Sequence, residues 1–372
     1  MPPAEFAILA INPGSTSTKF AVYRNDRPEL VRSLCHSAAE MQPYRGRPIL
    51  DQLRFRQEAL ERELRAAGYA PRDFHAIVGR GGLLRPLPGG TYRVTDEMLD
   101  ELRRAPFGEH ASNLGAFLAW AVARDAKVDA YVVDPVSVDE FSQKARISGS
   151  ALVVRRSLSH ALNTRAIARR FAREQGKSYE DLRLVVAHLG SGISVSAHEH
   201  GRMVDVNLAG QEGPFSTERC GGVQLAGIVQ LCFSGKYTEP QLWDALIREG
   251  GIYSYLGTKD LREVESRIAS GDPTAALIFD AMAYQIGKEI GAAATVLRGR
   301  LDAILLTGGM ARSSKLVADL RAAVEWIAPI AVYPGEDELQ ALAEGALRVL
   351  RAEEPARELP SETAAAPLAL AL

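Results

Sequence analysis

The feature that most constrains the fold of this chain is an arrangement of strands that occurs twice around a polar, glycine-containing loop. The first copy consists of a strand, a Ser/Thr-rich loop and two further strands, at residues 6–11, 12–18, 19–24 and 29–35. The second copy has the same order, at residues 182–188, 190–192, 193–198 and 203–206. The copies begin about 180 residues apart, far longer than the period of a solenoid repeat. The pattern therefore predicts two lobes with related folds.

Helices and further apolar strands follow each copy, which indicates an α/β architecture. Helical patterns lie at residues 49–67, 97–104, 113–124, 161–175, 313–327 and 337–350. The additional strands lie at residues 76–79, 130–134, 301–306 and 330–333. With 372 residues, the chain exceeds one average domain of roughly 150 residues. We therefore expect two α/β lobes with a cleft between them.

The expected lobes have definite boundaries. Residues 1–140 and 335–355 are predicted to form an N-terminal lobe, to which the last helix returns. Residues 141–334 are predicted to form a C-terminal, nucleotide-binding lobe. The segment 356–372 is rich in Ala, Pro and Glu, a composition that favours disorder.

Composition excludes several classes of protein. Lys and Arg number 44 against 46 Asp and Glu, a net charge of −2, whereas a dedicated nucleic-acid-binding protein carries a basic excess. No apolar run approaches the roughly 20 residues needed to cross a bilayer, and the first residues lack the pattern of a signal peptide. Three cysteines without metal-ligand spacing favour a reducing compartment. We expect a cytoplasmic protein with no nucleic-acid or membrane partner.

Three glycine-containing loops have the composition of phosphate-binding loops. The first, GSTSTK at 14–19, offers backbone N–H groups, four hydroxyls and one ammonium group, which suit phosphate oxygens, although an ordinary hairpin turn is an alternative. A strand rather than a helix follows it, so it is not a Walker A loop. The second, HLGSG at 188–192, lies at the same place in the repeat. The third, TGGMAR at 307–312, joins a strand to a helix, where helix N-termini receive phosphate. Together the loops predict a nucleotide held in the cleft.

Longer blocks of the chain make a closer comparison possible. They are INPGSTSTK (11–19), VGRGGLLRP (78–86), PGGTY (88–92), DPVSVDE (134–140), ARISG (145–149), SHALN (159–163), AHLGSGIS (187–194), EGPFSTERCGG (212–222), FSGKYT (233–238), YLG (255–257), AYQIGKEIG (283–291), LTGG (306–309) and VYPGEDELQALAEGALR (332–348). These blocks resemble butyrate kinases of the acetokinase family, within the superfamily of acetate and sugar kinases, heat-shock chaperones and actin. The resemblance extends from residue 6 to residue 352.

The resemblance implies both a fold and a reaction. The fold is α/β, a two-lobed, duplicated actin-like ATPase fold of the ribonuclease H type with an interlobe cleft. The reaction is the reversible transfer of the γ-phosphoryl group of ATP, with Mg²⁺, to butyrate or a branched short-chain fatty acid, which gives ADP and an acyl phosphate. A carboxylate is already ionised at neutral pH, so the reaction needs no general base and depends on positioning and on neutralising charge. The family also implies a homodimer or higher homo-oligomer.

The resemblance also implies site residues, at the positions of this chain that match the motifs of the family. The implied catalytic residues are Arg80, Asp134, His160 and Arg219, the two arginines being suited to bidentate contacts with carboxylate and phosphoryl oxygens. The implied nucleotide and phosphate contacts are Asn12, Ser15, Ser17, Lys19, His188, Gly190, Ser191, Gly192, Thr307, Gly308 and Gly309. The implied Mg²⁺ contacts are Asn12, Asp134 and Glu338, although Glu336 or Asp337 could replace Glu338. The structural alternatives are surface ion pairs for the arginines and an interaction with the helix dipole for Glu338.

The acyl pocket is assigned to Gly81, Gly82, His110 and Ser159. Two glycines and a serine beside the implied catalytic residues suggest room for a tail longer than that of acetate. Each buried methylene contributes about 0.8 kcal/mol, so butyrate or isobutyrate is favoured. A pocket discriminates one methylene by only about 1–3 kcal/mol, so broad activity on acids of neighbouring lengths is expected.

Three other functions stay open at this point. The substrate could be isobutyrate or another branched acid, or it could be acetate or propionate. A non-kinase ATPase switch of the same superfamily is an alternative from another class, but such a protein would lack the carboxylate-binding arginines. The sequence leaves open the preferred acid, the physiological direction and the subunit number.

Overall fold

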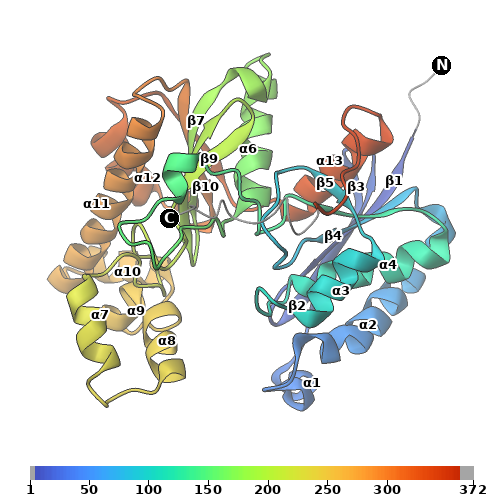
Figure 1. The fold of residues 1–372 in the computed structure, drawn as a ribbon, viewed down its shortest axis with the longest axis horizontal. Helices are drawn as coiled ribbons and strands as arrows, with labels where there is room; N and C mark the ends of the chain where they lie inside the picture. Colours follow the sequence, from blue (N-terminus) through green and yellow to red (C-terminus); the bar gives the residue numbers. More distant parts are fainter. Residues whose placement is uncertain (1–4, 361–372) are drawn as a thin grey trace. The chain divides into compact units, whose positions relative to one another are not determined.

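The structure, a computed structural model, describes residues 5–360 and divides into two units (Figure 1). Unit 1 contains residues 5–139 and 337–360, and unit 2 contains residues 140–336. The chain passes from unit 1 to unit 2 after Asp139 and returns after Glu336. Within the described residues, none of the helices has the length and apolar character that a bilayer crossing requires.

Unit 1 contains a six-stranded sheet in the order β3-β2-β1-β4-β6-β5. Its strands are β1 (Ala7–Pro13), β2 (Ser17–Arg24), β3 (Arg27–Cys35), β4 (Ala76–Arg80), β5 (Thr91–Arg93) and β6 (Ala130–Val133). Its helices are α1 (Ala38–Met41), α2 (Leu53–Ala66), α3 (Asp96–Arg104), α4 (Asn113–Ala126) and α13 (Glu338–Leu350). Helices α4 and α13 cover opposite faces of the sheet: Gly115 of α4 lies against Arg80 and Gly79, and Gly345 of α13 lies against Val133.

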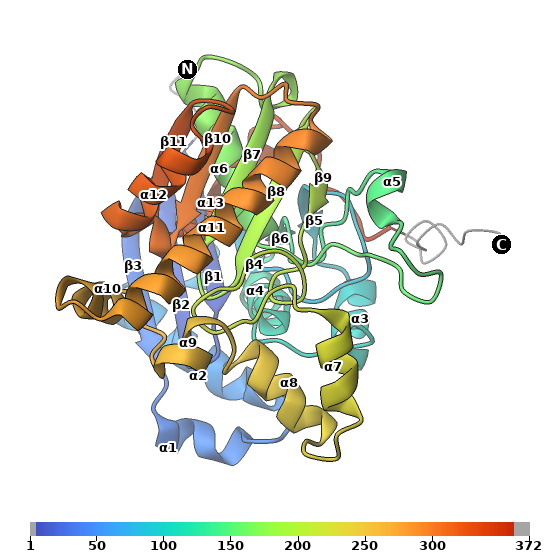
Figure 2. The same ribbon diagram turned by 90° about the vertical axis from the view of Figure 1, so that its left-hand side faces the viewer.

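Unit 2 contains a five-stranded sheet in the order β11-β10-β7-β8-β9. Its strands are β7 (Arg183–Leu189), β8 (Ile193–Glu199), β9 (Arg202–Val206), β10 (Ala303–Gly308) and β11 (Ile330–Pro334). Its helices are α5 (Gln143–Arg146), α6 (Ala161–Glu174), α7 (Leu225–Cys232), α8 (Glu239–Ile247), α9 (Gly251–Leu256), α10 (Leu261–Ala269), α11 (Pro273–Val296) and α12 (Ser314–Val324). In Figure 2, α11 and α12 lie on the near face of this sheet and α6 lies on the far face.

The two sheets share one topology. In unit 1, β3, β2 and β1 are antiparallel neighbours, and β4 and β6 then continue the sheet in parallel with β1. In unit 2, β9, β8 and β7 are antiparallel neighbours, and β10 and β11 continue in parallel with β7. The repeat seen in the sequence is therefore a duplication of this five-stranded arrangement, and the predicted two-lobed α/β fold class is confirmed.

Alternating side chains explain why these segments form buried strands. In β7, Val185 and Ala187 pack in the cluster of α11 and α12, whereas Leu184 and Val186 pack in the cluster of α6. Successive residues of a strand point to opposite faces, so a strand covered on both faces is apolar throughout. Strand β1 shows the same pattern, with all seven residues buried. Strand β3 lies at the edge of its sheet and is largely exposed.

The end of the described chain differs from the expectation of a disordered tail from residue 356. The backbone N–H of Arg357 donates to the carbonyl of Thr91, and the backbone carbonyl of Arg357 accepts the N–H of Arg93. Leu359 is buried. Arg85 donates to the carbonyl of Pro360. Residues 356–360 are therefore fixed beside β5, because they meet its unpaired edge, and the remainder of the predicted tail, 361–372, lies outside the described residues.

Candidate active site

Polar residues gather where three neighbouring strands of unit 1 end. Strands β1, β4 and β6 are parallel neighbours, with Ile11 beside Gly79 and Arg80 beside Val133. The register therefore places Asn12, Arg80 and Asp134 at one edge of the sheet, the edge at which open α/β sheets bind ligands. Glu338, the first residue of α13, completes this group, which we call the unit-1 cluster.

Close contacts join three members of the unit-1 cluster. The Nδ2 atom of Asn12 lies 2.5 Å from Oε2 of Glu338, and Nη1 of Arg80 lies 2.5 Å from each carboxylate oxygen of Glu338. Glu338 is buried, and Arg80 is largely buried. The charge of Arg80 is thus offset by a carboxylate, and its guanidinium is fixed at the strand end.

Asp134 is held in an uncommon backbone conformation. Its φ angle is +38°, its side chain is buried, and its Oδ1 accepts the N–H of Gly90 at 2.7 Å. The Asp134 N–H donates in turn to the carbonyl of Gly90. Non-glycine residues rarely adopt positive φ, although Asp is among the side chains that tolerate it, and such strain is common at functional sites.

The donor set of the unit-1 cluster suits Mg²⁺, which takes oxygen ligands and usually one or two carboxylates with several waters. Asp134 offers a carboxylate, and Asn12 offers its amide oxygen, because its nitrogen already donates to Glu338. Glu338 fits less well, since both of its oxygens contact Arg80. Among residues 5–360, no group of three or more His, Cys, Asp or Glu side chains is arranged to hold a metal. The cluster therefore fits a water-rich Mg²⁺ site and not a fully protein-ligated one.

The first predicted loop is the turn between β1 and β2, and a buried arginine fixes it. Arg56 of α2 donates to the carbonyls of Ser15 and Ser17 and to the hydroxyl of Thr18. Its side chain is fully buried, and burial lowers its pKa to about 10. Lys19 is exposed and lies opposite Asn12, so their side chains share one face of the sheet. Sequence reasoning missed Arg56, because an arginine in a polar helix gives no signal of burial.

In unit 2, the second predicted loop packs against Arg219. A β-carbon on Gly192 would lie 2.7 Å from Nη1 of Arg219, so glycine is what admits the guanidinium there. Nη1 donates to the carbonyl of Ala209 at 3.2 Å. The Nε–H of Arg219 is buried and finds no acceptor within the part of the chain that the structure describes. Burial lowers the pKa of Arg219, and the carboxylate of Glu218 acts in the opposite direction. A half-buried guanidinium with a buried, unsatisfied donor is suited to an anion.

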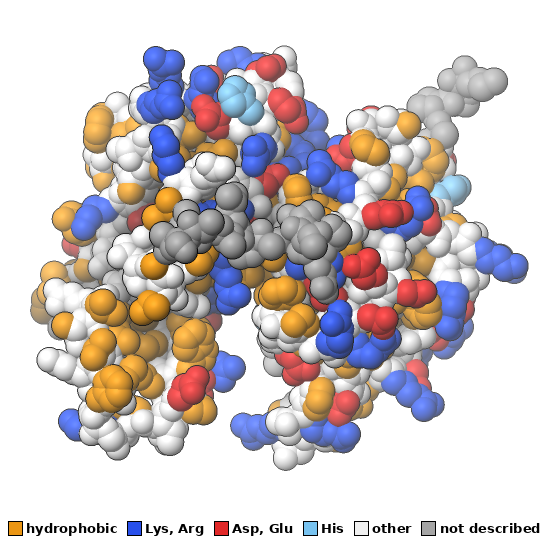
Figure 3. Space-filling view, in the orientation of Figure 1, with side chains coloured by type: hydrophobic (Ala, Val, Ile, Leu, Met, Phe, Trp, Pro, Cys, Tyr) orange, Lys and Arg blue, Asp and Glu red, His pale blue; other side chains and the backbone are white. Residues whose placement is uncertain are grey.

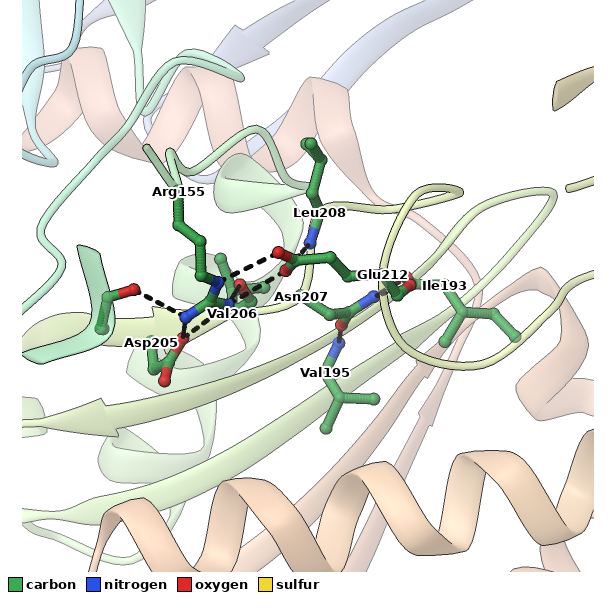
Figure 4. Close-up of polar contacts among 9 residues, drawn as sticks. Arg155, Ile193, Val195, Asp205, Val206, Asn207, Leu208 and Glu212 are labelled. Atoms are coloured by element: carbon green, nitrogen blue, oxygen red, sulfur yellow. Dashed lines mark hydrogen bonds and ion pairs between the residues drawn. The ribbon is translucent and has the colours of Figure 1, made fainter. Parts of the chain in front are cut away.

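The loop that carries Arg219 is held by the network drawn in Figure 4. Arg155 forms bidentate contacts of 3.0 Å with Glu212 and donates to Asp205 at 3.2 Å. Asn207 accepts the N–H of Val195 and donates to the carbonyls of Ile193 and Glu212. These contacts tie the start of the loop to β8 and β9. At its far end, the Ser216 hydroxyl accepts the N–H of Arg219 and donates to the carbonyl of Ser191.

Two predicted histidines lie together in unit 2. The rings of His160 and His188 are stacked, with centroids 3.8 Å apart and planes 10° apart. Nδ1 of His160 lies 2.9 Å from the hydroxyl of Ser194. His188 is almost fully buried, with Nδ1 2.8 Å from Oδ1 of Asn163 and Nε2 3.2 Å from Oε1 of Glu336.

The third predicted loop contributes to a cavity in unit 2 but not through all of its residues. A cavity of about 760 Å³ is lined by Gly190, Ser191, Thr217, Lys259, Asp260, Leu261, Arg262, Glu265, Gly309, Met310, Arg312, Ser313 and Glu336. Gly309 is thus at the cavity, whereas Thr307 is buried and donates to the carbonyl of Gly335. Gly308 has a φ of +90° and no space for a side chain, because the backbone of Leu189 lies against it. Thr307 and Gly308 therefore shape the loop.

Several cavity residues were missed by sequence reasoning. Lys259, Asp260 and Arg262 follow directly after the YLG block, and Arg312 ends the third loop. Lys259 also forms an ion pair of 3.0 Å with Glu218. Charged residues directly after a recognised block were the available signal, but only the folded chain brings them beside Gly190 and Gly309.

Of the predicted acyl-pocket residues, Gly81, Gly82 and His110 lie in unit 1 and Ser159 lies in unit 2. A β-carbon on Gly81 would lie 2.4 Å from Cβ of Pro135, and one on Gly82 would lie 2.4 Å from Oδ1 of Asn113. The space that these glycines leave is therefore already filled, and the argument that they enlarge a pocket is wrong. His110 is exposed and contacts Ser112. Ser159 is buried, with its hydroxyl 3.6 Å from the sulfur of Met203.

Comparison with solved structures confirms the fold. The acetate kinase of Porphyromonas gingivalis superposes with a TM-score of 0.75 at 18% identity, covering 93% of this chain and 100% of that one. A propionate kinase of Francisella tularensis gives 0.69 at 16% identity, covering 91% and 98%. The acetate kinase of Entamoeba histolytica gives 0.72 at 16% identity, with the same coverage.

The sequence comparison identifies the family. The sequence pattern that defines the acetokinase family matches residues 145–335, which include β7, β8 and the loop that carries Arg219. This match covers more than half of the chain. The chain belongs to the acetokinase family, a family of carboxylate kinases.

Proposed function

We propose that this protein is a butyrate kinase, which transfers the γ-phosphoryl group of ATP to butyrate or a branched short-chain fatty acid. A carboxylate oxygen of the acid attacks the γ-phosphorus, and the bond from the γ-phosphorus to the bridging oxygen of ADP breaks. The products are ADP and an acyl phosphate, and the reverse direction forms ATP. The observation that carries the proposal is Arg219, a half-buried arginine whose buried Nε–H is unsatisfied beside the second glycine loop.

The residues of the chain would act by binding and orienting the reactants. ATP would occupy the 760 Å³ cavity, where Lys259, Arg262 and Arg312 supply positive charge and Gly190 and Gly309 allow close approach of the backbone. Arg219 would contact the transferred phosphoryl group through its bidentate fork, and Arg80 would hold the carboxylate of the acid. His160 would donate a hydrogen bond to a phosphoryl oxygen. No proton has to be removed from the ionised acid.

Asp134 and Asn12 are the residues that would hold Mg²⁺, which would neutralise charge on phosphate oxygens when bound. Glu338 orients Asn12 and Arg80 through the contacts described above. Its part in this proposal is therefore to fix the two side chains, with the metal contact assigned to Asp134.

Acyl phosphate formation is the direct test of the proposal. The purified protein is incubated with MgATP and each linear or branched acid from acetate to hexanoate, and hydroxylamine traps the product as a hydroxamate. We expect butyrate or isobutyrate to give the highest kcat/KM, with neighbouring acids used less well. Absence of hydroxamate with every acid would refute the kinase proposal and favour an ATPase switch. Higher kcat/KM for acetate or propionate would reject the butyrate assignment alone.

Arginine variants test the site. Arg80→Lys keeps the charge that offsets Glu338 but removes the bidentate fork, and we expect kcat/KM to fall at least about 100-fold. Arg24→Lys is the matched control, because Arg24 pairs with Glu29 on the partly exposed surface of the same unit. Equal activity of the Arg80→Lys and Arg24→Lys proteins would exclude Arg80 from the site.

We further propose that the protein forms a homo-oligomer, and the surface of α7 and α8 supports this. No residue of either helix is buried, and Leu225, Phe233 and Trp243 are exposed by 77%, 87% and 51%. Figure 3 shows apolar side chains gathered over these helices. Short helices in water depend on burying an apolar face, and aromatic side chains bury roughly 150–250 Å² each. A standard interface buries about 800 Å² per partner, and a symmetric contact of this surface with its own copy would bury these aromatic side chains on both partners.

The assembly is measured by light scattering during size-exclusion chromatography. We expect at least twice the chain mass of 40.3 kDa for the natural protein and a shift to the single-chain mass for Phe233→Ser/Trp243→Ser. Trp326→Ser is the control, since Trp326 is 82% exposed on the segment after α12. A natural protein that elutes at the mass of one chain at micromolar concentration would refute this proposal.

A further inference from the structure

Glu336 is a carboxylate that the proposed chemistry does not use, although it lies where that chemistry would occur. It follows β11 and is the last residue of unit 2. It lines the 760 Å³ cavity together with Gly190 and Ser191. Its Oε1 lies 3.2 Å from Nε2 of His188 and 3.4 Å from the place that a β-carbon on Gly190 would occupy. The absence of a side chain at Gly190 therefore leaves room for this contact.

The contact bears on where His188 carries a proton. Nε2 of His188 and Oε1 of Glu336 lie at an ion-pair distance of 3.2 Å, and because a carboxylate only accepts hydrogen bonds, this contact favours a proton on Nε2. On the other side of the ring, Nδ1 lies 2.8 Å from the Asn163 amide, which can accept or donate according to its orientation. In a neutral ring, a proton on Nε2 leaves Nδ1 as an acceptor, and Asn163 then presents its amide nitrogen to Nδ1.

The ring of His188 is in turn stacked against the ring of His160. The two rings are stacked at 3.8 Å and within 10° of parallel, and His188 is almost fully buried. His160 is fixed from its own Nδ1 by the Ser194 hydroxyl at 2.9 Å. The plane of the His160 ring thus depends on the orientation of the His188 ring, which is contacted at both of its own nitrogens, by Asn163 and by Glu336.

We propose that Glu336 is a positioning residue, which holds a proton on Nε2 of His188 and so fixes the ring against which His160 is stacked. A carboxylate that fixes the tautomer and direction of a histidine is a recurring device in enzymes. The effect on catalysis rests on the proposed function, because His160 is assigned there to the phosphoryl group. The effect on the His188 ring does not depend on it.

The first experiment uses nuclear magnetic resonance of the full chain labelled with ¹⁵N in histidine, without substrate. The His188 signals are assigned with His188→Gln. We expect the natural protein to show a slowly exchanging Nε2–H on His188, and we expect Glu336→Ala to lose it and to shift the ring signals of His160. Glu336→Gln supplies a neutral acceptor of similar shape and serves if the alanine variant does not fold. Unchanged His188 signals in the folded variants would overturn the proposal whatever the protein catalyses.

The second experiment is steady-state kinetics with MgATP and the best acid. Glu336→Ala is expected to lower kcat about 10–100-fold, with Glu336→Gln intermediate. The KM for ATP should stay equal or fall, because a negative charge leaves the cavity. The control is Glu325→Gln, at a surface acid that pairs with Arg321. A joint loss of kcat, ATP affinity and Tm would instead indicate a structural role, and full activity of Glu336→Ala would reject the positioning role.

Natural protein without kinase activity but with the Nε2–H signal would refute only the proposed function.

Discussion

Substituting Gly192 by alanine tests whether the position of Arg219 matters to the reaction. The new β-carbon would lie 2.7 Å from Nη1 and 2.9 Å from Cζ of Arg219. Carbon atoms in good contact are separated by about 3.5–4.0 Å, so the guanidinium must move by roughly 1 Å. The atoms in conflict belong to the far end of a long side chain, and the φ angle of Gly192 is not positive, so the backbone can keep its conformation.

The expected result is a loss of activity without a loss of stability. A displacement of roughly 1 Å at a catalytic group can lower the rate by about 100-fold, so we expect kcat/KM to fall 10–100-fold, or about 1.4–2.8 kcal/mol of transition-state stabilisation. The free energy of unfolding should change by no more than about 1 kcal/mol. Activity is measured by the hydroxamate assay and stability by urea denaturation. Arg219 cannot shift freely to compensate, because the loop network of Arg155 and Asn207 fixes the segment that carries it.

Gly222→Ala is the matched control in the same loop. A β-carbon on Gly222 would lie 3.6 Å from the nearest atom, the carbonyl oxygen of Gly213, so no neighbour has to move. We expect this variant to retain full activity. Equal kcat/KM for the Gly192→Ala protein and the control, at equal stability, would refute the reasoning that places Arg219 at the transferred phosphoryl group.

Three further predictions concern stability and metal binding. Arg56→Met should lower the free energy of unfolding by about 2–4 kcal/mol, measured in urea, because the turn carbonyls lose a buried charged donor. Burial, and then the charges of Glu212 and Asp205, raise the pKa of Glu289 in the folded protein. Because the ionised carboxylate opposes folding, the free energy of unfolding decreases as pH rises above the pKa that Glu289 has in the unfolded chain. Glu289→Gln should therefore be more stable than the natural protein in urea at pH 8 and equal to it at pH 4, and the opposite order would reject this reading. Asp134→Asn should fold normally, because Asn also tolerates positive φ, but should need more Mg²⁺ for half-maximal activity; an unchanged Mg²⁺ requirement would exclude Asp134 as the ligand.

Much of the architecture could be predicted from local patterns. The buried runs at 6–11 and 182–188, each followed by a polar turn and a second strand, correspond to β1, β2, β7 and β8, because hydrophobic alternation and turn residues act over a few positions. The helix expected at 49–67 is divided in the structure into a 3₁₀ turn at Ile49–Gln52 and helix α2, a difference at the boundary only. The short edge strand β5 was not predicted, since three residues carry too little pattern.

The candidate site could be predicted only in part. Arg80, Asp134 and Glu338 were recognisable because each stands at the end of a strand or the start of a helix within a distinctive block. The roles of Gly81 and Gly82 could not be judged, because a glycine that opens space and a glycine that another chain segment fills look the same in a sequence. Pro135 and Asn113, which fill that space, are far away along the chain.

The duplicated strand order and the residue types that phosphoryl transfer requires could be recognised in the chain alone, since these depend on short-range spacing, and the similarity of whole sequence blocks identified the family. Three contacts could be seen only in the folded chain: Arg56 supports the first turn, Gly192 makes room for Arg219, and Glu336 meets His188. Those contacts join residues 27 to 148 positions apart. Their existence depends on sheet register and on excluded volume, which act through space and leave no periodic trace in the order of amino acids.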